Sequence, residues 1–328
     1  MIEFLTGFLG ELVQLAGGTV RISTPLILAA LAGLVSERSG IIDIGLEGKI
    51  LGAAFAAGAA AAVFDNPWMG LMAGITMSVV LAVLHGFIAI SQNGNQIVSG
   101  MAINIFVAGL APTLATSWFH KGGQTPLLLN ESRFGHITLP LADSLADVPV
   151  IGPIYSELLS GHTILTYLAF ALVPLVAFGL YRTRFGLRLR AVGENPEAVD
   201  TAGISVTWLR YRAVMLAGVL CGIAGTVLST AQGAGFIRDM SAGKGYLALA
   251  AMIFGHWKPL PTLGACLLFG FVDALQGRLQ GEELPLIGEI PVQFTMMLPY
   301  VLTVVILAGF VGRMTPPKAS GTPYRKDH

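Results

Sequence analysis

Apolar stretches about twenty residues long recur along the whole chain, and they constrain the fold more than any other feature. A helix needs about 20 mostly apolar residues to cross a bilayer. The sequence predicts such spans near residues 20–35, 42–64, 68–90, 97–118, 162–181, 213–231, 245–254, 263–279 and 292–310. The stretch 245–254 is too short to cross alone and is predicted to be part of a broken or re-entrant helix. Only 12% of the 328 residues are charged, too few to cover a soluble domain of this size. We therefore predict an all-α, polytopic transmembrane helical bundle of about nine or ten spans, forming a single membrane domain over residues 1–328.

The first eighteen residues have a pattern of their own. Apolar residues recur at helical spacing from Phe4 to Leu12, with Glu3 and Glu11 between them. This pattern predicts an amphipathic helix over residues 1–18 that lies in the membrane interface. A first span, which would bring the number to ten, is the alternative. The segment contains no Lys or Arg, so it lacks the positive region that begins a cleavable signal peptide.

Basic residues gather in two segments and set the predicted orientation. Ten of the 19 lie in residues 182–212 and 312–328: Arg182, Arg184, Arg188, Arg190, Arg210, Arg212, Arg313, Lys318, Arg325 and Lys326. Loops rich in Lys and Arg stay on the cytoplasmic side. In the loops 119–161 and 281–291, acidic residues outnumber basic ones. We expect a multi-pass protein of the cell (inner, cytoplasmic) membrane, with its C-terminus in the cytoplasm.

A short helix is specified inside the basic loop. Asn195 is a good N-cap, and Pro196 suits the first helical position. Glu197 complements the helix dipole, and Gly203 is placed as a C-terminal stop. These residues predict a helix of about two turns over residues 196–202, which is marginal by itself and needs a surface to pack against. It could be a grip for a motor subunit or a solvated loop that only fixes topology, and its chemistry leaves both open.

Several longer segments carry a family resemblance. They are RTRFGLRLRAVGENPEAVDTAGI at 182–204, SERSGIIDIGLEGKILGAAFAA at 36–57, NQIVSGMAIN at 95–104, SAGKGYLALAAMIFGHWKPL at 241–260, LPYVLTVVILA at 298–308 and PPKASGTPYRK at 316–326. Taken in order, they resemble permeases of the branched-chain amino acid and simple sugar ABC transporter group. More narrowly, they resemble its nucleoside-uptake permeases, which pair with a second, unlike permease. Asp43 departs from the asparagine expected there.

The resemblance implies a transport subunit without catalytic residues or a cofactor. It would be the permease of an ATP-driven importer for nucleosides, or alternatively for ribose-like simple sugars. ATP hydrolysis would belong to a separate chain, and this one has no G-x-x-x-x-G-K-[ST] phosphate loop. Implied partners are a second permease, ATPase subunits and an extracellular or periplasmic solute-binding lipoprotein, within the lipid bilayer. By resemblance, the ATPase would hold Gly193, Glu194, Asn195, Pro196, Glu197 and Ala198. With zero net charge, nothing indicates a nucleic-acid partner.

Polar residues at membrane depth are candidates for the solute path. Asp43 and Glu47 are four residues apart and share one helix face. Glycines at 40, 45, 48 and 52 surround them, which favours a discontinuous helix that lines the path. Alternatively, the segment begins at the cytoplasmic interface and its charges meet only headgroups, Arg38 or Lys49.

A second glycine-rich stretch covers residues 232–244, in the other half of the chain. Phe236 and Tyr246 could stack on a flat base, and Gln232 or Lys244 could hydrogen-bond it. The alternative is an ordinary outer loop with interfacial aromatic residues. Two glycine-rich breaks, one in each half, are a weak indication of an inverted repeat.

The remaining polar residues have simpler interpretations. Gln96 and Asn104 are eight apart and share a helix face, where hydrogen bonding between helices is favoured over solute contact. His85 is expected to pack between helices, and no metal-ligand spacing occurs. The spans 68–118 and 292–310 contain no Asp, Glu, Lys or Arg. That absence argues against a stand-alone secondary transporter with a carboxylate relay, and no Ser/His or paired-Asp arrangement indicates an intramembrane enzyme.

Overall fold

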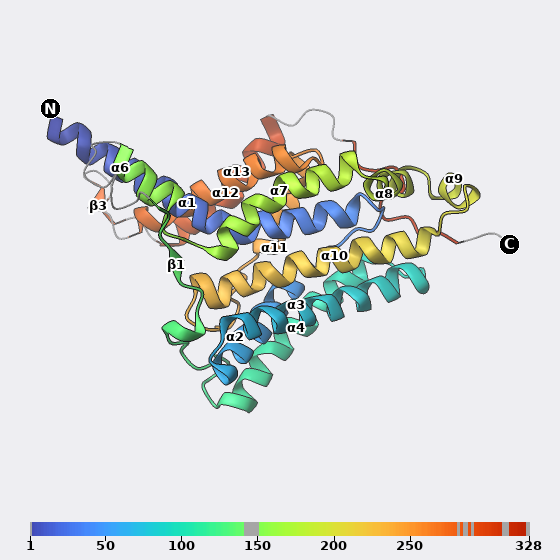
Figure 1. Ribbon diagram of the computed structural model, residues 1–328, viewed down its shortest axis with the longest axis horizontal. Coiled ribbons are helices and arrows are strands. Elements are labelled where there is room, and N and C mark those ends of the chain that lie inside the picture. The colour runs from blue at the N-terminus through green and yellow to red at the C-terminus, as the bar shows by residue number, and fades with distance from the viewer. Residues whose placement is uncertain are drawn as a thin grey trace.

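The protein is an elongated helical bundle in the computed structural model, which describes residues 2–140, 151–280, 283–284, 288–289, 292–309 and 315–325 (Figure 1). Arg313 and Lys326 lie outside these residues, as do parts of the acidic loops 119–161 and 281–291 and the last residue of the predicted span 292–310. The all-α, polytopic architecture is confirmed.

Seven helices in the described part of the chain are long and apolar enough to cross a membrane. Two of them continue into a π-helical turn, which places an extra residue in the helical turn. The seven helices are α1 (Ile2–Glu37), α2 (Leu46–Phe64), α3 (Pro67–Gly86) with η1 (Phe87–Ser91), α4 (Gln96–Phe119), α7 (Ile164–Arg182), α10 (Val206–Thr226) with η4 (Val227–Gln232), and α12 (Pro259–Leu279).

Two further helices complete the bundle. α11 (Lys244–Phe254) has 11 residues, and α13 (Val292–Gly309) has 18. Each of the nine predicted spans overlaps one of these nine helices. The prediction that residues 245–254 form part of a broken helix agrees with the length of α11, since 11 residues rise only about 16 Å.

At the N-terminus the structure differs from the expected division. One continuous helix, α1, runs from Ile2 to Glu37 and includes Pro25. No boundary occurs at Gly18, so the predicted interfacial segment is continuous with the predicted span 20–35. A long amphipathic stretch can extend a spanning helix as well as precede one. Gly17 instead permits close approach, since a Cβ there would lie 2.6 Å from the Glu157 carbonyl oxygen.

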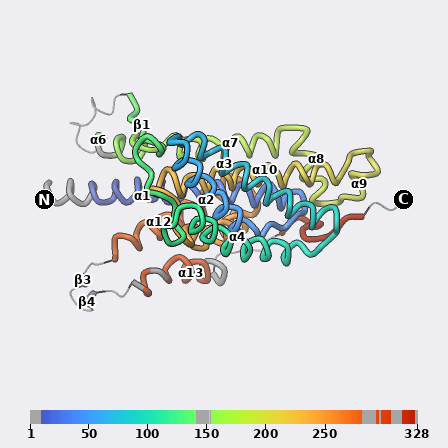
Figure 2. Tube along the Cα trace, turned by 90° about the horizontal axis from the view of Figure 1, so that it is seen from below, coloured from blue at the N-terminus to red at the C-terminus, as the bar shows by residue number. Residues whose placement is uncertain are grey.

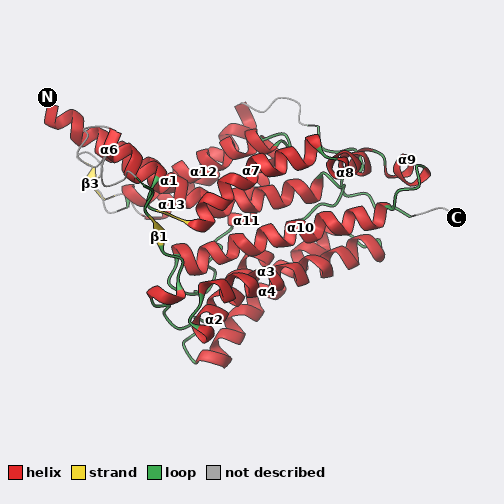
Figure 3. Ribbon diagram, in the orientation of Figure 1, coloured by secondary structure: helices red, strands yellow, loops and turns green. Residues whose placement is uncertain are grey.

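Shorter elements lie at the two ends of the bundle. One end holds η2 (Asn130–Ser132), α6 (Ile151–Ile154), η3 (Tyr155–Leu159) and two small antiparallel pairs, β1 (His136–Ile137) with β2 (His162–Thr163) and β3 (Glu283–Leu284) with β4 (Gly288–Glu289). The other end holds α8 (Arg184–Glu194), α9 (Pro196–Thr201) and the C-terminal tail of residues 315–325. Figure 3 shows the described strands gathered at one end, opposite α8 and α9.

The core forms around α1 and α10. α10 packs against α1, α2 and α3, while α12 and α7 pack against α1. The apolar stretches of α1 and α10 are mostly buried, whereas in those of α4, α7 and α12 only about a third of the residues or fewer are buried. Figure 2 shows α7 and α13 on opposite sides of the bundle. An apolar helix that is exposed in the isolated chain can face lipid or another subunit.

A candidate solute site at two helix breaks

The first break separates α1 from α2. After Glu37 the chain turns through residues 38–45 without helical structure, and α2 begins at Leu46. Gly40 occupies this stretch with a φ of +88°, a conformation that L side chains rarely adopt. Gly45, which precedes α2, provides no side-chain cap. The expected discontinuity in this glycine-rich segment is therefore present.

The second break separates η4 from α11. Residues 233–243 connect the two helices without regular structure. Gly235 and Gly243 have φ angles of +127° and +79°, so glycine makes these turns possible. Gly243 is also the N-cap position of α11 and offers no side chain to the free amides of the helix.

Glu47 joins the two breaks. Its carboxylate accepts hydrogen bonds from the Gly243 and Gly245 amides at 2.8 and 2.7 Å. An anion at a helix N-terminus satisfies free amides and is attracted by the helix dipole. The helices approach closely there, because a Cβ on Gly245 would lie 2.5 Å from the Glu47 nitrogen. Glu47 on α2 thus acts as the missing cap of α11.

Asn104 connects α4 to the same place. Its Oδ1 accepts from the Gly48 amide at 2.8 Å, and its Nδ2 donates to the Ile44 carbonyl and the Tyr246 hydroxyl, both at 2.9 Å. A Cβ on Gly48 would lie 2.9 Å from the Asn104 Cα, so only glycine fits without movement. Asn104 therefore forms hydrogen bonds between helices, as its spacing predicted, and one of them reaches Tyr246 in α11.

A cavity of about 290 Å³ opens where these elements meet. It lies near the lower end of the range of about 300–1,000 Å³ that is typical of small-molecule sites. Its lining combines hydrogen-bonding groups with apolar side chains: Glu47, Gly48, Leu51, Met101, Asn104, Ile105, Ala108, Asp239, Ser241, Ala242, Gly243 and Tyr246. No Lys or Arg belongs to this lining. Three predicted residues, Glu47, Asn104 and Tyr246, are thus brought together.

Behind the cavity a buried ion pair supports the first break. Asp43 and Lys49 are both fully buried and form a salt bridge. His85 bonds the Ile42 carbonyl through Nε2 at 3.0 Å, and Gln96 Oε1 accepts from the Ile42 amide at 2.7 Å. Asp43 and Gln96 do not belong to the lining of the cavity, and His85 is packed between helices as predicted.

The helices that follow the two breaks, α2 and α11, run in opposite directions. α2 ends beside Asp65, whose carboxylate accepts a bond from Ser132 at the β1–β2 end of the bundle. α11 ends near Trp257, whose indole donates to Glu37 at the end of α1. Each half of the chain therefore supplies a helix that starts at the cavity. This arrangement is the one that an inverted repeat would produce.

Other predicted path residues lie elsewhere. Phe236 is buried and packs edge-to-face on Phe55, with ring centroids 5.4 Å apart. Gln232 lines a separate cavity near Arg21, and its Nε2 donates to the Arg21 carbonyl at 2.5 Å. Lys244 points to Asp273 on α12, with a nitrogen–oxygen distance of 3.9 Å. None of the three belongs to the lining of the cavity at the breaks.

The short helix predicted over residues 196–202 is present as α9, at the end of the bundle away from the strands (Figure 3). α9 begins at Pro196, and Asn195 Oδ1 accepts from the Ala198 amide at 3.1 Å, as an N-cap does. Glu194, Asn195, Glu197 and Ala198 are exposed, and Pro196 is half-buried. Gly193 differs from its neighbours because it is buried, and a Cβ there would lie 2.3 Å from the Arg38 carbonyl oxygen.

Sequence reasoning missed several residues here. Met101, Asp239 and Ser241 line the cavity without any local signal that distinguishes them from other span and loop residues. Arg210, interpreted only as a topology signal, is buried. Among the described residues, no group of three His, Cys, Asp or Glu side chains could hold a metal ion.

Comparison with known proteins gives a consistent set of relatives. Residues 15–307 match the family described as branched-chain amino acid transport system/permease component. A guanosine ABC transporter permease protein, NupQ of Bacillus subtilis (strain 168), is 39% identical over 94% of this chain and 95% of its own length. A nucleoside ABC transporter permease protein, NupC of Lactococcus lactis subsp. cremoris (strain MG1363), is 37% identical over 93% and 94%. A putative glucose ABC transporter permease protein, TsgC13 of Haloferax volcanii, is 35% identical over 88% and 87%.

Proposed function

The chain belongs to the branched-chain amino acid transport system/permease component family, and on that premise we propose that it carries nucleosides through the cavity at its two helix breaks. It is the permease component of an ABC importer. Relatives named for guanosine and for nucleosides, at 39% and 37% identity, support the choice of solute.

The observation that carries the proposal is the chemistry of the cavity wall. A nucleotide or an amino acid would bring a phosphate or carboxylate, which requires a cation or a free helix N-terminus. The wall contains no Lys or Arg. The amides at the start of α11 are already bonded to Glu47, and the Gly48 amide is bonded to Asn104. The wall therefore disfavours an anionic solute. Its two carboxylates, Glu47 and Asp239, already have partners in the Gly243 and Gly245 amides and in Arg238, so an uncharged polar solute fits best.

One aromatic side chain separates nucleosides from sugars. Tyr246 is 42% exposed and presents its ring at the cavity, where Leu51 and Met101 add apolar surface. A flat base can stack on such a ring, and stacking contributes about 1–3 kcal/mol per base. A hexose or pentose is the second candidate solute, because one relative is named for glucose.

Uptake into proteoliposomes tests the solute. The vesicles would contain this chain with its ATPase, second permease and binding lipoprotein, and ATP inside. Labelled uridine, adenosine, ribose and leucine would be compared. Tyr246→Leu should lower nucleoside uptake by roughly tenfold, while Tyr246→Phe keeps the ring and stays near wild type. Phe178→Leu, at an exposed residue of α7 outside the cavity, is the matched control. Uptake of ribose but not nucleosides would overturn the proposed solute.

The proposed orientation places the α8–α9 end in the cytoplasm, because basic residues are concentrated there. The exposed surface of α9 around Glu194, Asn195, Glu197 and Ala198 would sit in a groove of the ATPase subunit, with Gly193 supporting it from beneath. ATP-driven closure of the motor would then switch access to the cavity.

A paired substitution checks this contact. Glu194→Ala with Pro196→Gly should abolish ATP-dependent uptake while the chain remains stable in the membrane. Arg188→Ala, on an exposed residue of α8, is the control and should keep uptake within about twofold. Uptake by this chain alone without ATP would overturn the dependence on an ATPase.

A second, unlike permease would complete the pathway. The cavity opens beside an exposed apolar face of α4, where Ile105 and Phe106 are 71% and 55% exposed. A partner on this face would close the cavity from the side. A solute-binding lipoprotein would dock at the β1–β2 end. Co-purification of both proteins with the tagged chain tests the assembly, and recovery of only self-associated chain would contradict it.

A further inference from the structure

The C-terminal tail lies across the junction between α8 and the first break. The Ala319 amide donates to the Gly193 carbonyl at 2.8 Å, and the Gly321 amide donates to the Gly40 carbonyl at 3.0 Å. Gly193 in turn rests on the backbone of Arg38. Three segments that are far apart in the sequence are thus joined by contacts between their backbones.

Arg210 fixes the same junction from α10. Its side chain is 1% exposed, and it donates to the Ser39 carbonyl through Nε at 3.3 Å and to the Thr322 carbonyl through Nη1 at 3.4 Å. Among the described residues it forms no salt bridge. A buried guanidinium without a carboxylate is costly. Its presence here indicates a role that simple packing would not require.

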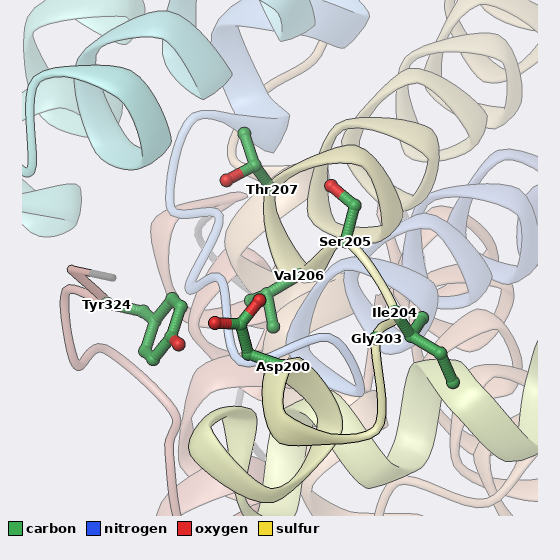
Figure 4. A pocket seen from close by; sticks show the side chains of 7 residues that line it. All are labelled: Asp200, Gly203, Ile204, Ser205, Val206, Thr207 and Tyr324. Atoms are coloured by element: carbon green, nitrogen blue, oxygen red, sulfur yellow. The ribbon is translucent and has the colours of Figure 1, made fainter. Parts of the chain in front are cut away.

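The far end of the tail reaches α9. Tyr324 packs against the small apolar cluster of Val192, Val199, Val206 and Leu209 at the base of α8, α9 and α10. Figure 4 shows its ring beside Asp200 at a cleft of about 260 Å³ between α9, the start of α10 and the tail. The tail therefore contacts the short helix as well as the first break.

From the junction the contacts continue to the cavity. Arg38 donates to the Trp257 carbonyl, with distances of 3.0 and 2.7 Å from Nε and Nη2, and so ties the start of the break to the end of α11. Further along the same break, Ile44 accepts from Asn104, which lines the cavity. One short stretch, residues 38–45, thus contacts the tail at its beginning and the cavity at its end.

From these contacts, we propose that Arg210 and the tail segment 318–322 are positioning residues of the transport cycle, which transmit displacement of α8 and α9 to the helix break that forms the cavity wall. A movement of α9 must shift residues 38–45 or break the bonds to Ala319 and Gly321. This inference rests on the proposed function, since it assumes that an ATPase moves α9.

A cysteine reporter in the cavity tests the transmission without reference to the solute. Ala242 is exposed and lines the cavity, and Ala242→Cys would be labelled with a maleimide. The native Cys221 and Cys266 are buried and should stay unlabelled. In the assembled complex, the labelling rate is compared between the ATP-free state and a state trapped with ATP and vanadate. An ATP-dependent change in this parent establishes the motor's action on the cavity.

Two variants then decide the inference. Arg210→Gln removes the guanidinium, and Ala319→Arg places a long side chain where Ala319 is buried, without altering a spanning helix. Each should reduce the ATP-dependent change in labelling by roughly fivefold or more, while the complex assembles and hydrolyses ATP. Thr315→Arg adds the same charge at an exposed tail position and should behave like the parent.

The outcomes separate the inference from the proposed function. Unchanged labelling differences in Ala319→Arg would overturn the inference, even if Arg210→Gln fails to assemble. A parent whose reporter responds to ATP but which takes up no nucleoside would overturn only the solute. A parent without any ATP response would overturn the proposed coupling itself.

Discussion

Replacing Glu47 with glutamine isolates the contact that joins the two helix breaks. The carboxylate accepts from the Gly243 and Gly245 amides at 2.8 and 2.7 Å. Glutamine keeps one acceptor oxygen and turns an NH₂ group toward the other amide. One hydrogen bond to a charged group is lost, worth about 1.5–3 kcal/mol, and the other weakens to a neutral bond of about 1 kcal/mol. The start of α11 should therefore lose about 2–5 kcal/mol of local stability.

Hydrogen exchange measured by mass spectrometry can detect this loss. Peptides that cover residues 241–247 should exchange roughly thirtyfold faster or more in Glu47→Gln, since 1.36 kcal/mol corresponds to about tenfold. Glu47→Asp retains the charge but shortens the reach, so its effect should be intermediate. Peptides from α7, which are remote from the contact, should be unchanged. Unaltered exchange at 241–247, or an equal increase everywhere, would refute the capping role.

Three other substitutions test separate parts of the argument. Asp43→Asn leaves the Lys49 ammonium buried without its partner and should lower the free energy of unfolding, measured thermally, by about 3–5 kcal/mol. Adding Lys49→Met should recover most of that loss, and a double variant as unstable as Asp43→Asn would contradict the ion-pair interpretation. Gly48→Ala places a Cβ against the backbone of α4, so it should lower the free energy of unfolding by about 1–3 kcal/mol and impair uptake. Gly109 has open space around it, so Gly109→Ala should change neither stability nor uptake. Burial lowers the pKa of His162, which lies in β2 just before α7, although the ring also bonds the Leu158 carbonyl. Below the usual histidine pKa of about 6.5, the unfolded chain gains a proton that the folded chain resists. The free energy of unfolding should therefore fall as pH falls from about 7 to 5, and His162→Gln should flatten that slope.

The features that could be predicted from the sequence depend on local chemistry. The helix at Pro196 follows from capping by Asn195 and from a stop at Gly203, all within nine residues. The spans follow from runs of apolar residues, because lipid leaves backbone groups no other partner than their own helix. The breaks follow from glycine density, since positive φ angles at Gly40 and Gly243 need glycine.

The composition of the site depends on contacts that no local pattern records. Glu47 and Gly243 are 196 residues apart, and Asn104 and Tyr246 are 142 apart. The helical spacing of Asp43 and Glu47 suggested one shared face, but the helix starts only at Leu46, so the two carboxylates take different partners. Arg210 has the composition of a topology signal, and only its packing distinguishes it from the exposed Arg212 and its neighbours.

The way in which charges are used in the membrane part also bears on how transport is driven. Within the described part of the chain, Asp43 is neutralised by Lys49, and both oxygens of Glu47 are bonded to amides at the start of α11. These carboxylates hold the breaks in place and are not available to carry protons along the path. A relay of the kind that secondary transporters use would need ionisable groups free to change partners. Under the proposed coupling, the energy for moving an uncharged solute would enter mechanically, at the end of the bundle where α8, α9 and the tail meet the first break.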